Sequence, residues 1–229
     1  MKLASSLLTT AFAAAFSTLA LAGCTSESSG GGGGSGGSTG TETTTESTTS
    51  DTGPVALTGK DVAGEWASAG CEAYPDGKGG ESYLTRDFTL TETTWDLSFS
   101  VFGDKDCKVA LFTAQIHGPF TLGALSKTAD GATEGQFAFE TNAWTAHNQQ
   151  MADTFTGAGC GAGAWEVDKA QEVGGTGCIG VAHKIADCPE EYDLVGIKDG
   201  QLYFGERITD MCTEAGRPAA LGPYGLTKK

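Results

Sequence analysis

Glu72 and Arg86 are the charged residues whose placement most favours a specific interaction. Both lie in segments where apolar and polar residues alternate as in β-strands. An arginine guanidinium can hold a carboxylate through two parallel hydrogen bonds. We therefore expect a structural ion pair inside the fold or at its mouth. Two alternatives stay open: a solvent-exposed pair that contributes little to stability, and direct contact of the pair with a ligand.

Two sets of residues carry the donor types that metal ions bind. Calcium prefers oxygen ligands, and three aspartates lie in predicted turns: Asp76, Asp104 and Asp106. No Asp-x-Asp-x-Asp-Gly loop accompanies them, so we interpret them as solvated carboxylates. The three histidines have no ligand spacing and no Cys-x-x-Cys is present. The sequence predicts neither a metal nor another cofactor.

His147, Asp153 and Ser126 supply the residue types of a hydrolase triad. However, no Gly-x-Ser-x-Gly motif is present to position the serine as a nucleophile. Paired carboxylates for glycoside chemistry cannot be singled out among 29 acidic residues. We therefore predict a non-catalytic protein.

Apolar and polar residues alternate after residue 94, which places four apolar side chains on one face of a strand: Trp95, Leu97, Phe99 and Val101. Strand-like runs at residues 83–90 and 109–116 flank it through linkers short enough for hairpin turns. One helix is predicted at residues 145–155. Many short strands with a single helix are typical of an antiparallel barrel. We predict a mainly β, disulfide-stapled domain, either a curved sheet or a lipocalin-like β-barrel.

Three finer expectations concern a break in one strand, one additional strand and the C-terminal tail. Gly118 and Pro119 predict a break after the third strand of the meander. Residues 181–185 predict a further strand, and residues 217–226 predict an irregular tail punctuated by proline and glycine.

A barrel of this size can enclose one small ligand. Eight apolar residues are then candidates for the pocket lining: Trp66, Phe88, Trp95, Leu97, Phe99, Val101, Phe137 and Phe139. The alternative is that these side chains fill a closed core.

Residues 1–23 have the pattern of a secretory signal peptide, with Lys2 before an apolar, alanine-rich run. Leu-Ala-Gly-Cys at residues 21–24 resembles the bacterial lipobox, whose cysteine becomes the lipidated first residue. We expect Cys24 to carry a lipid anchor that holds the protein on the bacterial envelope, at the outer membrane or cell surface. The alternative is an ordinary signal peptide that ends near a cysteine.

Residues 24–54 are rich in Gly, Ser, Thr and Glu and predict a disordered tether, which leaves residues 55–229 as one domain. The net charge of −15 becomes −16 when the signal peptide, with its single charged residue Lys2, is removed. An acidic chain without a basic patch argues against a nucleic-acid partner.

Six cysteines remain beside Cys24, and an even number in an exported chain indicates disulfides: Cys71, Cys107, Cys160, Cys178, Cys188 and Cys212. Two strand-like runs flank a Lys-Asp-Gly turn at residues 198–200, which brings Cys188 opposite Cys212. Sequence proximity suggests the other pairings, Cys71 with Cys107 and Cys160 with Cys178.

Ordered motifs extend over residues 59–226: Gly-x-Trp-x-Ser-x-Gly-Cys-Glu at 64–72, Leu-Thr-Arg-x-Phe at 84–88, His-Gly-Pro-Phe at 117–120, Gly-Ala-Thr-Glu at 131–134 and Leu-Tyr-Phe-Gly-Glu at 202–206. Together they resemble the adenomatosis polyposis coli down-regulated domain. The resemblance implies a curved barrel with disulfides and a hydrophobic pocket. Its animal members are membrane-tethered Wnt antagonists with two such domains, and their pocket is thought to take the acyl chain of Wnt.

This chain departs from the animal plan, because it has one domain and a bacterial type of signal and anchor. A bacterium has no Wnt, so the antagonist role is not expected to transfer. We predict an envelope lipoprotein that binds a hydrophobic or acylated ligand in its barrel. The alternative is a module with a packed interior that binds an envelope protein through its surface.

Overall fold

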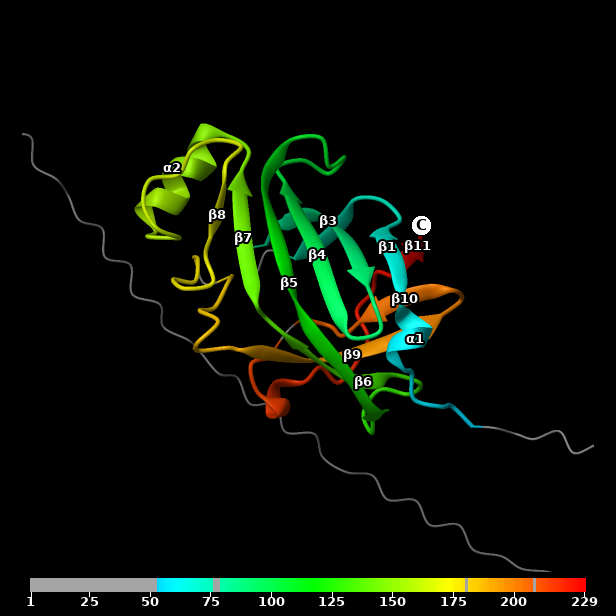
Figure 1. Ribbon diagram of the computed structural model, residues 1–229. Coiled ribbons are helices and arrows are strands. Elements are labelled where there is room, and N and C mark those ends of the chain that lie inside the picture. Colours follow the sequence, from blue (N-terminus) through cyan, green and yellow to red (C-terminus); the bar gives the residue numbers. More distant parts are fainter. Residues whose placement is uncertain (1–52, 76–78, 180, 208) are drawn as a thin grey trace, which may run out of the picture. The chain divides into compact units, whose positions relative to one another are not determined.

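The computed structural model describes residues 53–75, 79–179, 181–207 and 209–229, and most of their strands form one barrel (Figure 1). The predicted signal peptide, Cys24 and residues 25–52 of the predicted tether lie outside the described residues. Within the described part of the chain, no helix combines the length and hydrophobicity needed to cross a membrane.

Eight antiparallel strands form a closed ring in which each strand pairs with the next along the ring and the last pairs with the first. They are β1 (Gly64–Ser68), β3 (Glu81–Leu90), β4 (Thr94–Phe102), β5 (Ala110–Leu125), β6 (Thr133–Ala138), β9 (Glu190–Lys198), β10 (Gln201–Phe204) and β11 (Leu226–Lys228). Closure leaves this ring without a free edge. The prediction of a mainly β, lipocalin-like barrel is confirmed.

The C-terminal residues close the barrel, so the predicted irregular tail is only partly correct. Leu226 of β11 pairs with Ser68 of β1 and with Leu202 of β10. The Leu226 side chain is fully buried in the barrel core. The sequence signal was weak because β11 has three residues, too few for an alternating pattern to be recognised.

Strand β5 continues through Gly118 and Pro119, so the predicted break is wrong. Pro119 stays in register opposite Thr94 of β4. On its other side β5 changes partner here: residues 112–117 pair with β7 (Thr141–Ala146), and residues 120–125 pair with β6. Proline lacks an N–H, so it fits where no partner strand needs that hydrogen bond.

Residues 139–189 are an insertion between β6 and β9 that carries β7, α2 (Gln149–Gly157) and β8 (Ala170–Glu172). Figure 1 places α2 and β8 beside β7, at the side of the barrel away from β10 and β11. The predicted helix start at residue 145 is wrong, because β7 runs to Ala146. The helix begins after Asn148, whose Oδ1 accepts a hydrogen bond of 2.9 Å from the Met151 N–H.

Short elements complete the chain: α1 (Gly59–Val62), β2 (Glu72–Pro75) and the 3₁₀ turn Glu214–Gly216. β2 extends the β1 side of β3, with Glu72 opposite Leu84. The predicted strand at residues 181–185 is absent, since Ala182 makes only an isolated bridge to Cys178 within a tight turn.

The two larger buried clusters of the described residues fill separate parts of the interior. The first, the barrel core, contains Trp66, Phe88, Trp95, Phe137 and Phe204 among others. The second, the insertion core, joins β5 and β7 to α2 and the loops after it, and its aromatic members are Phe112, Trp144, Phe155 and Trp165. The insertion is therefore packed onto the barrel wall through its own apolar contacts.

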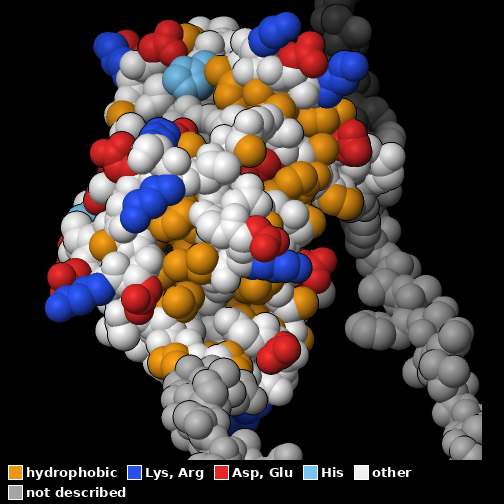
Figure 2. All heavy atoms as spheres, turned by 90° about the vertical axis from the view of Figure 1, so that its right-hand side faces the viewer, with side chains coloured by type: hydrophobic (Ala, Val, Ile, Leu, Met, Phe, Trp, Pro, Cys, Tyr) orange, Lys and Arg blue, Asp and Glu red, His pale blue; other side chains and the backbone are white. Residues whose placement is uncertain are grey.

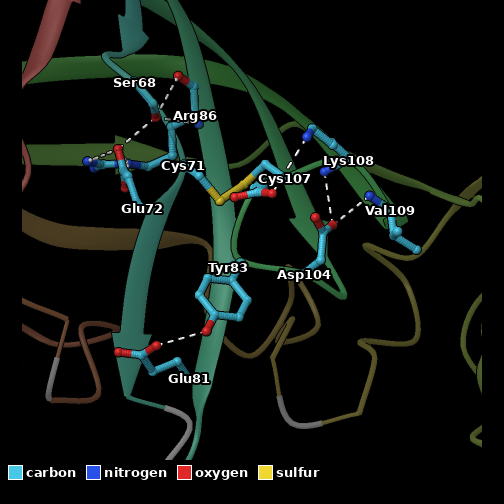
Figure 3. Close-up of a disulfide and its surroundings, with 11 residues drawn as sticks. Ser68, Cys71, Glu72, Glu81, Tyr83, Arg86, Asp104, Cys107, Lys108 and Val109 are labelled. Carbon is cyan, nitrogen blue, oxygen red and sulfur yellow. Dashed lines mark hydrogen bonds and ion pairs between the residues drawn. A yellow bond between two sulfur atoms is a disulfide. The ribbon is translucent and has the colours of Figure 1, made fainter.

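Three disulfides form, with the pairings that the sequence suggested: Cys71–Cys107, Cys160–Cys178 and Cys188–Cys212, at Cα–Cα distances of 5.6, 4.8 and 5.1 Å. The first ties the β1–β2 segment to the loop after β4 (Figure 3). The second closes the insertion, and the third ties the end of the insertion to the segment after β10.

Candidate ligand-binding site

An open cavity of about 610 Å³ lies inside the barrel, in the size range of small-molecule sites. Six of the eight predicted pocket residues line it: Phe88, Trp95, Leu97, Phe99, Phe137 and Phe139. Ala114 and Ile116 of β5 continue the same apolar wall. The interior is thus partly packed and partly hollow. The sequence left two alternatives open, a ligand pocket and a closed core, and each applies to a different region of the interior.

The other two predicted pocket residues, Trp66 and Val101, do not line this cavity. Trp66 is packed in the barrel core, where its Nε1 donates a 2.8 Å hydrogen bond to the Val62 carbonyl. Val101 packs against the insertion core. Alternation placed both side chains on the inner face, but neighbouring residues fill the space in front of them.

Trp95 is a large aromatic residue of the apolar wall. Its indole Nε1 donates a 2.9 Å hydrogen bond to the Ala138 carbonyl, which satisfies the one polar atom of the ring. The ring meets Phe137 and Phe139 edge-on, at centroid distances of 5.5 and 5.7 Å. These contacts hold a rigid aromatic surface toward the cavity.

Glu72 and Arg86 form the predicted ion pair, and Arg86 lines the cavity. Arg86 Nε lies 3.0 Å from Glu72 Oε2, and its Nη2 lies 3.0 Å from Oε1 (Figure 3). Ser68 Oγ donates to Oε1 at 2.6 Å and accepts the Arg86 N–H at 2.8 Å. The Tyr224 carbonyl accepts a further 3.0 Å bond from Nη2. The pair is therefore a buried structural unit of the wall.

Tyr74 and Tyr224 extend this polar side of the cavity, and their rings meet edge-on at 5.0 Å. Tyr74 donates a 3.2 Å hydrogen bond to Glu72 Oε2, and Tyr224 donates a 2.7 Å bond to the Ala73 carbonyl. Burial raises the pKa of Tyr74 to about 12. Its hydroxyl therefore remains a hydrogen-bond donor at neutral pH.

A second charged group, not predicted from the sequence, lies on β9 and after β10. Asp193 is 3% exposed, and its Oδ1 accepts backbone N–H bonds from Leu194 at 2.7 Å and Gly205 at 2.9 Å. Arg207 pairs with Glu191 and lies 3.7 Å from Asp193 Oδ2. Burial raises the pKa of Asp193 to about 6, and the Arg207 guanidinium opposes the rise.

A sequence signal for this group existed. Glu191, Asp193 and Val195 alternate along β9, and Val195 is buried in the barrel core. Residues two apart point to the same face of a strand, so the two carboxylates share the inward face with Val195.

The insertion supplies the remaining wall. Asn142 and Trp144 of β7 line the cavity, as do Val181, His183 and Ile185 of the loop after Cys178. Asn142 Oδ1 accepts the Trp144 Nε1–H at 2.8 Å, which identifies its other atom as the NH₂ group.

The predicted triad residues do not come together. His147 bonds instead to Thr113 Oγ1 through Nε2 at 2.9 Å and to Asp168 Oδ1 through Nδ1 at 2.8 Å. Thr113 lies between Phe112 and Ala114, which face the interior, so the group sits on the outer face of the sheet. It does not line the cavity, and we interpret it as a clamp that fixes the residue 168 loop against β5.

His183, Asp210 and Cys212 approach one another as three metal-type ligands would. Cys212, however, is bonded to Cys188, so its sulfur is not a thiolate. Asp104 of the predicted turn carboxylates accepts the Lys108 and Val109 N–H groups at 2.9 and 2.7 Å (Figure 3). Those bonds lower the pKa of Asp104. They also tie its side chain to the backbone of the same turn, as aspartates in turns commonly do.

Figure 2 shows Lys and Arg side chains scattered among acidic and uncharged ones, with no concentrated basic surface on the face displayed. Several of the cations pair with carboxylates, as Lys229 does with Asp87 and Lys169 with Glu166. This distribution gives no electrostatic footprint for a phosphate backbone on that face.

A closed eight-stranded barrel around an open, mainly apolar cavity defines a lipocalin-like cup. The family model described as adenomatosis polyposis coli down-regulated 1 matches residues 43–163, which is more than half of the chain. The chain belongs to this family, and the resemblance seen in its motifs is confirmed. The match covers Glu72, Arg86 and Trp95, whereas Asp193 lies beyond it.

Proposed function

We propose that this protein is a non-catalytic lipoprotein of the bacterial envelope that binds a hydrophobic or acylated ligand inside its barrel. The observation that carries the proposal is the open cavity of about 610 Å³ with aromatic and aliphatic walls. Burying an apolar chain there stabilises the complex by roughly 25 cal/mol per Å² of apolar surface removed from water. The Wnt-antagonist role of animal family members is not part of this proposal.

The proposed location rests on the sequence of the N-terminal residues. A lipid on Cys24 and the Gly- and Ser-rich stretch after it place the barrel near a membrane surface at the end of a tether. The tether leaves the cavity free to meet ligands that enter or leave the bilayer. Thr25, rather than Asp, after Cys24 favours the outer membrane in a cell with two membranes.

The test compares the mass of the full chain, purified with its disulfides formed, under native and denaturing conditions. A covalent lipid on Cys24 remains in both spectra, whereas a cavity ligand is present only in the native one. We expect a stoichiometric fatty-acyl compound in the native spectrum, or its uptake after incubation with single-chain amphiphiles.

A native mass equal to the denatured mass, unchanged after incubation with amphiphiles, overturns the proposal. That result favours the alternative, a protein-binding module. Its binding surface would then include exposed apolar side chains that do not line the cavity, such as Val109 and Ile179.

A further inference from the structure

The charged side chains that line the cavity are unevenly balanced. On the side formed by β9 and the end of β10 they are Glu191, Asp193, Glu206 and Arg207. Three carboxylates thus face one guanidinium. We call these four residues the acidic rim.

The other cation of the cavity wall does not offset this excess. Arg86 is held by both oxygens of Glu72 and by the Tyr224 carbonyl. The side chains of Arg86 and Glu72 are 13% and 4% exposed, so the pair is buried. Because Glu72 carries the opposite charge, it neutralises the guanidinium of Arg86 within the wall. The net charge that a ligand meets therefore comes from the acidic rim.

Within the acidic rim, Asp193 has unused binding capacity. Its Oδ1 is occupied by two backbone N–H groups, but no described residue donates a hydrogen bond to its Oδ2. Arg207 lies 3.7 Å from Oδ2, beyond hydrogen-bond distance, and its side chain is 57% exposed. Asp193 itself is only 3% exposed. Asp193, a residue of the cavity lining, thus keeps one carboxylate oxygen, Oδ2, for which Arg207 is an ion-pair partner but not a hydrogen-bond donor.

We propose that the cavity selects its occupant by the charge of the head group, binding an apolar chain with an ammonium or quaternary ammonium head in preference to one that ends in a carboxylate. The inference rests on the proposed function, since it assigns the ligand class of the same cavity. A cation near Asp193 and Glu191 gains attraction that solvent screens only in part. A carboxylate at the same place meets like charges, and a neutral head group falls between the two.

The experiment uses the full chain at pH 7.5 and three single-chain probes with the same twelve-carbon tail, all below their micelle concentrations: dodecyltrimethylammonium, dodecyl maltoside and dodecanoate. Binding is followed by calorimetry and by quenching of tryptophan fluorescence, to which Trp95 in the cavity wall contributes. We expect Kd to rise from the cation to the neutral probe to the carboxylate, with at least a tenfold span that shrinks in high salt.

Two variants locate the selectivity. Asp193→Asn retains an amide oxygen for the Leu194 and Gly205 N–H groups while removing the charge, and Glu191→Gln removes the second charge without touching those bonds. Each is expected to narrow the ratio between the affinities for the cation and the carboxylate at least threefold. Asp153→Asn, at an exposed position of α2, makes the same charge change away from the cavity and is expected to leave the ratio unchanged.

The outcomes separate the two proposals. If none of the probes binds, the proposed function fails and the inference falls with it. If probes bind with equal affinity, or dodecanoate binds tightest, the inference is overturned while the binding function stands. An unchanged ratio in Glu191→Gln and Asp193→Asn likewise overturns the assignment to the acidic rim, and Glu191→Gln keeps that test available if Asp193→Asn fails to fold.

Discussion

The Arg86 guanidinium donates two hydrogen bonds to the Glu72 carboxylate within the barrel wall, with Nε 3.0 Å from Oε2 and Nη2 3.0 Å from Oε1. Ser68 on β1 bonds to both partners, to the carboxylate of Glu72 and to the backbone N–H of Arg86. The three residues belong to β1, β2 and β3, so one polar unit fixes the irregular junction at which β1 gives way to β2.

Arg86→Ala is expected to lower the free energy of unfolding by about 3–5 kcal/mol, because it leaves the buried Glu72 carboxylate uncompensated. Denaturant unfolding measures the effect. Replacing both partners by methionine is expected to recover part of the loss, since no unpaired charge then remains.

The matched control is Asp87→Ala, which removes an exposed ion pair with Lys229 and is expected to change stability by less than about 1 kcal/mol. An Arg86→Ala protein with the midpoint of the parent would rule out a structural role for the pair.

Asp193→Asn is expected to change how stability depends on pH. Burial raises the folded-state pKa of Asp193 to about 6 from its ordinary value of 3.8, so between these values the folded protein binds more protons than the unfolded chain. The contribution of this group to stability is therefore greatest at low pH and is lost as pH rises through about 6. Each pKa unit corresponds to about 1.4 kcal/mol, so the variant is expected to gain up to about 3 kcal/mol relative to the parent between pH 4 and pH 7.

Urea unfolding at one-unit pH intervals measures this difference, with Asp153→Asn as the control. Parallel pH profiles for the parent and Asp193→Asn would show that Asp193 does not titrate in this window.

Leu97→Trp is expected to reduce the affinity for a twelve-carbon amphiphile at least tenfold, because the larger side chain projects into the cavity that Leu97 lines. The cavity gives the indole room, so the melting temperature is expected to stay within a few degrees of the parent. Calorimetric titration measures the affinity. Ile197→Trp, at a side chain 39% exposed and outside the cavity lining, is the control and is expected to bind normally. Full affinity in Leu97→Trp would place the ligand elsewhere.

Gly118→Ala is expected to destabilise the barrel by about 3 kcal/mol or more. A Cβ at this position would lie 2.0 Å from the Ala138 carbonyl oxygen, where β5 changes partner between β7 and β6. The contact is with backbone, so a rotamer change cannot relieve it. Gly175→Ala, with no atom within 4 Å of its Cβ position, is the control. Equal melting temperatures for the two variants would contradict this account of Gly118.

Local information was sufficient for much of this protein. The alternation of Trp95, Leu97 and Phe99 predicted an inward-facing strand, and six of the eight residues predicted to line a pocket do so. The Asp199–Gly200 turn predicted the β9–β10 hairpin; the φ angles of these two residues are 52° and 74°, as a two-residue hairpin turn requires. Hairpin register in turn placed Cys188 opposite Cys212.

The tertiary structure alone decided which inward-facing positions border empty space and which are packed. Trp66 and Leu97 carry the same alternating signal, yet neighbours from β11 and α1 cover Trp66, while Leu97 faces the cavity. Closure by the three-residue β11 and the switch of partner at Gly118 depend on segments far apart in the sequence. Residue type and the period of two determine which face of a strand a side chain occupies. The empty volume between the strands depends on how all of them pack together, so no local sequence pattern encodes it.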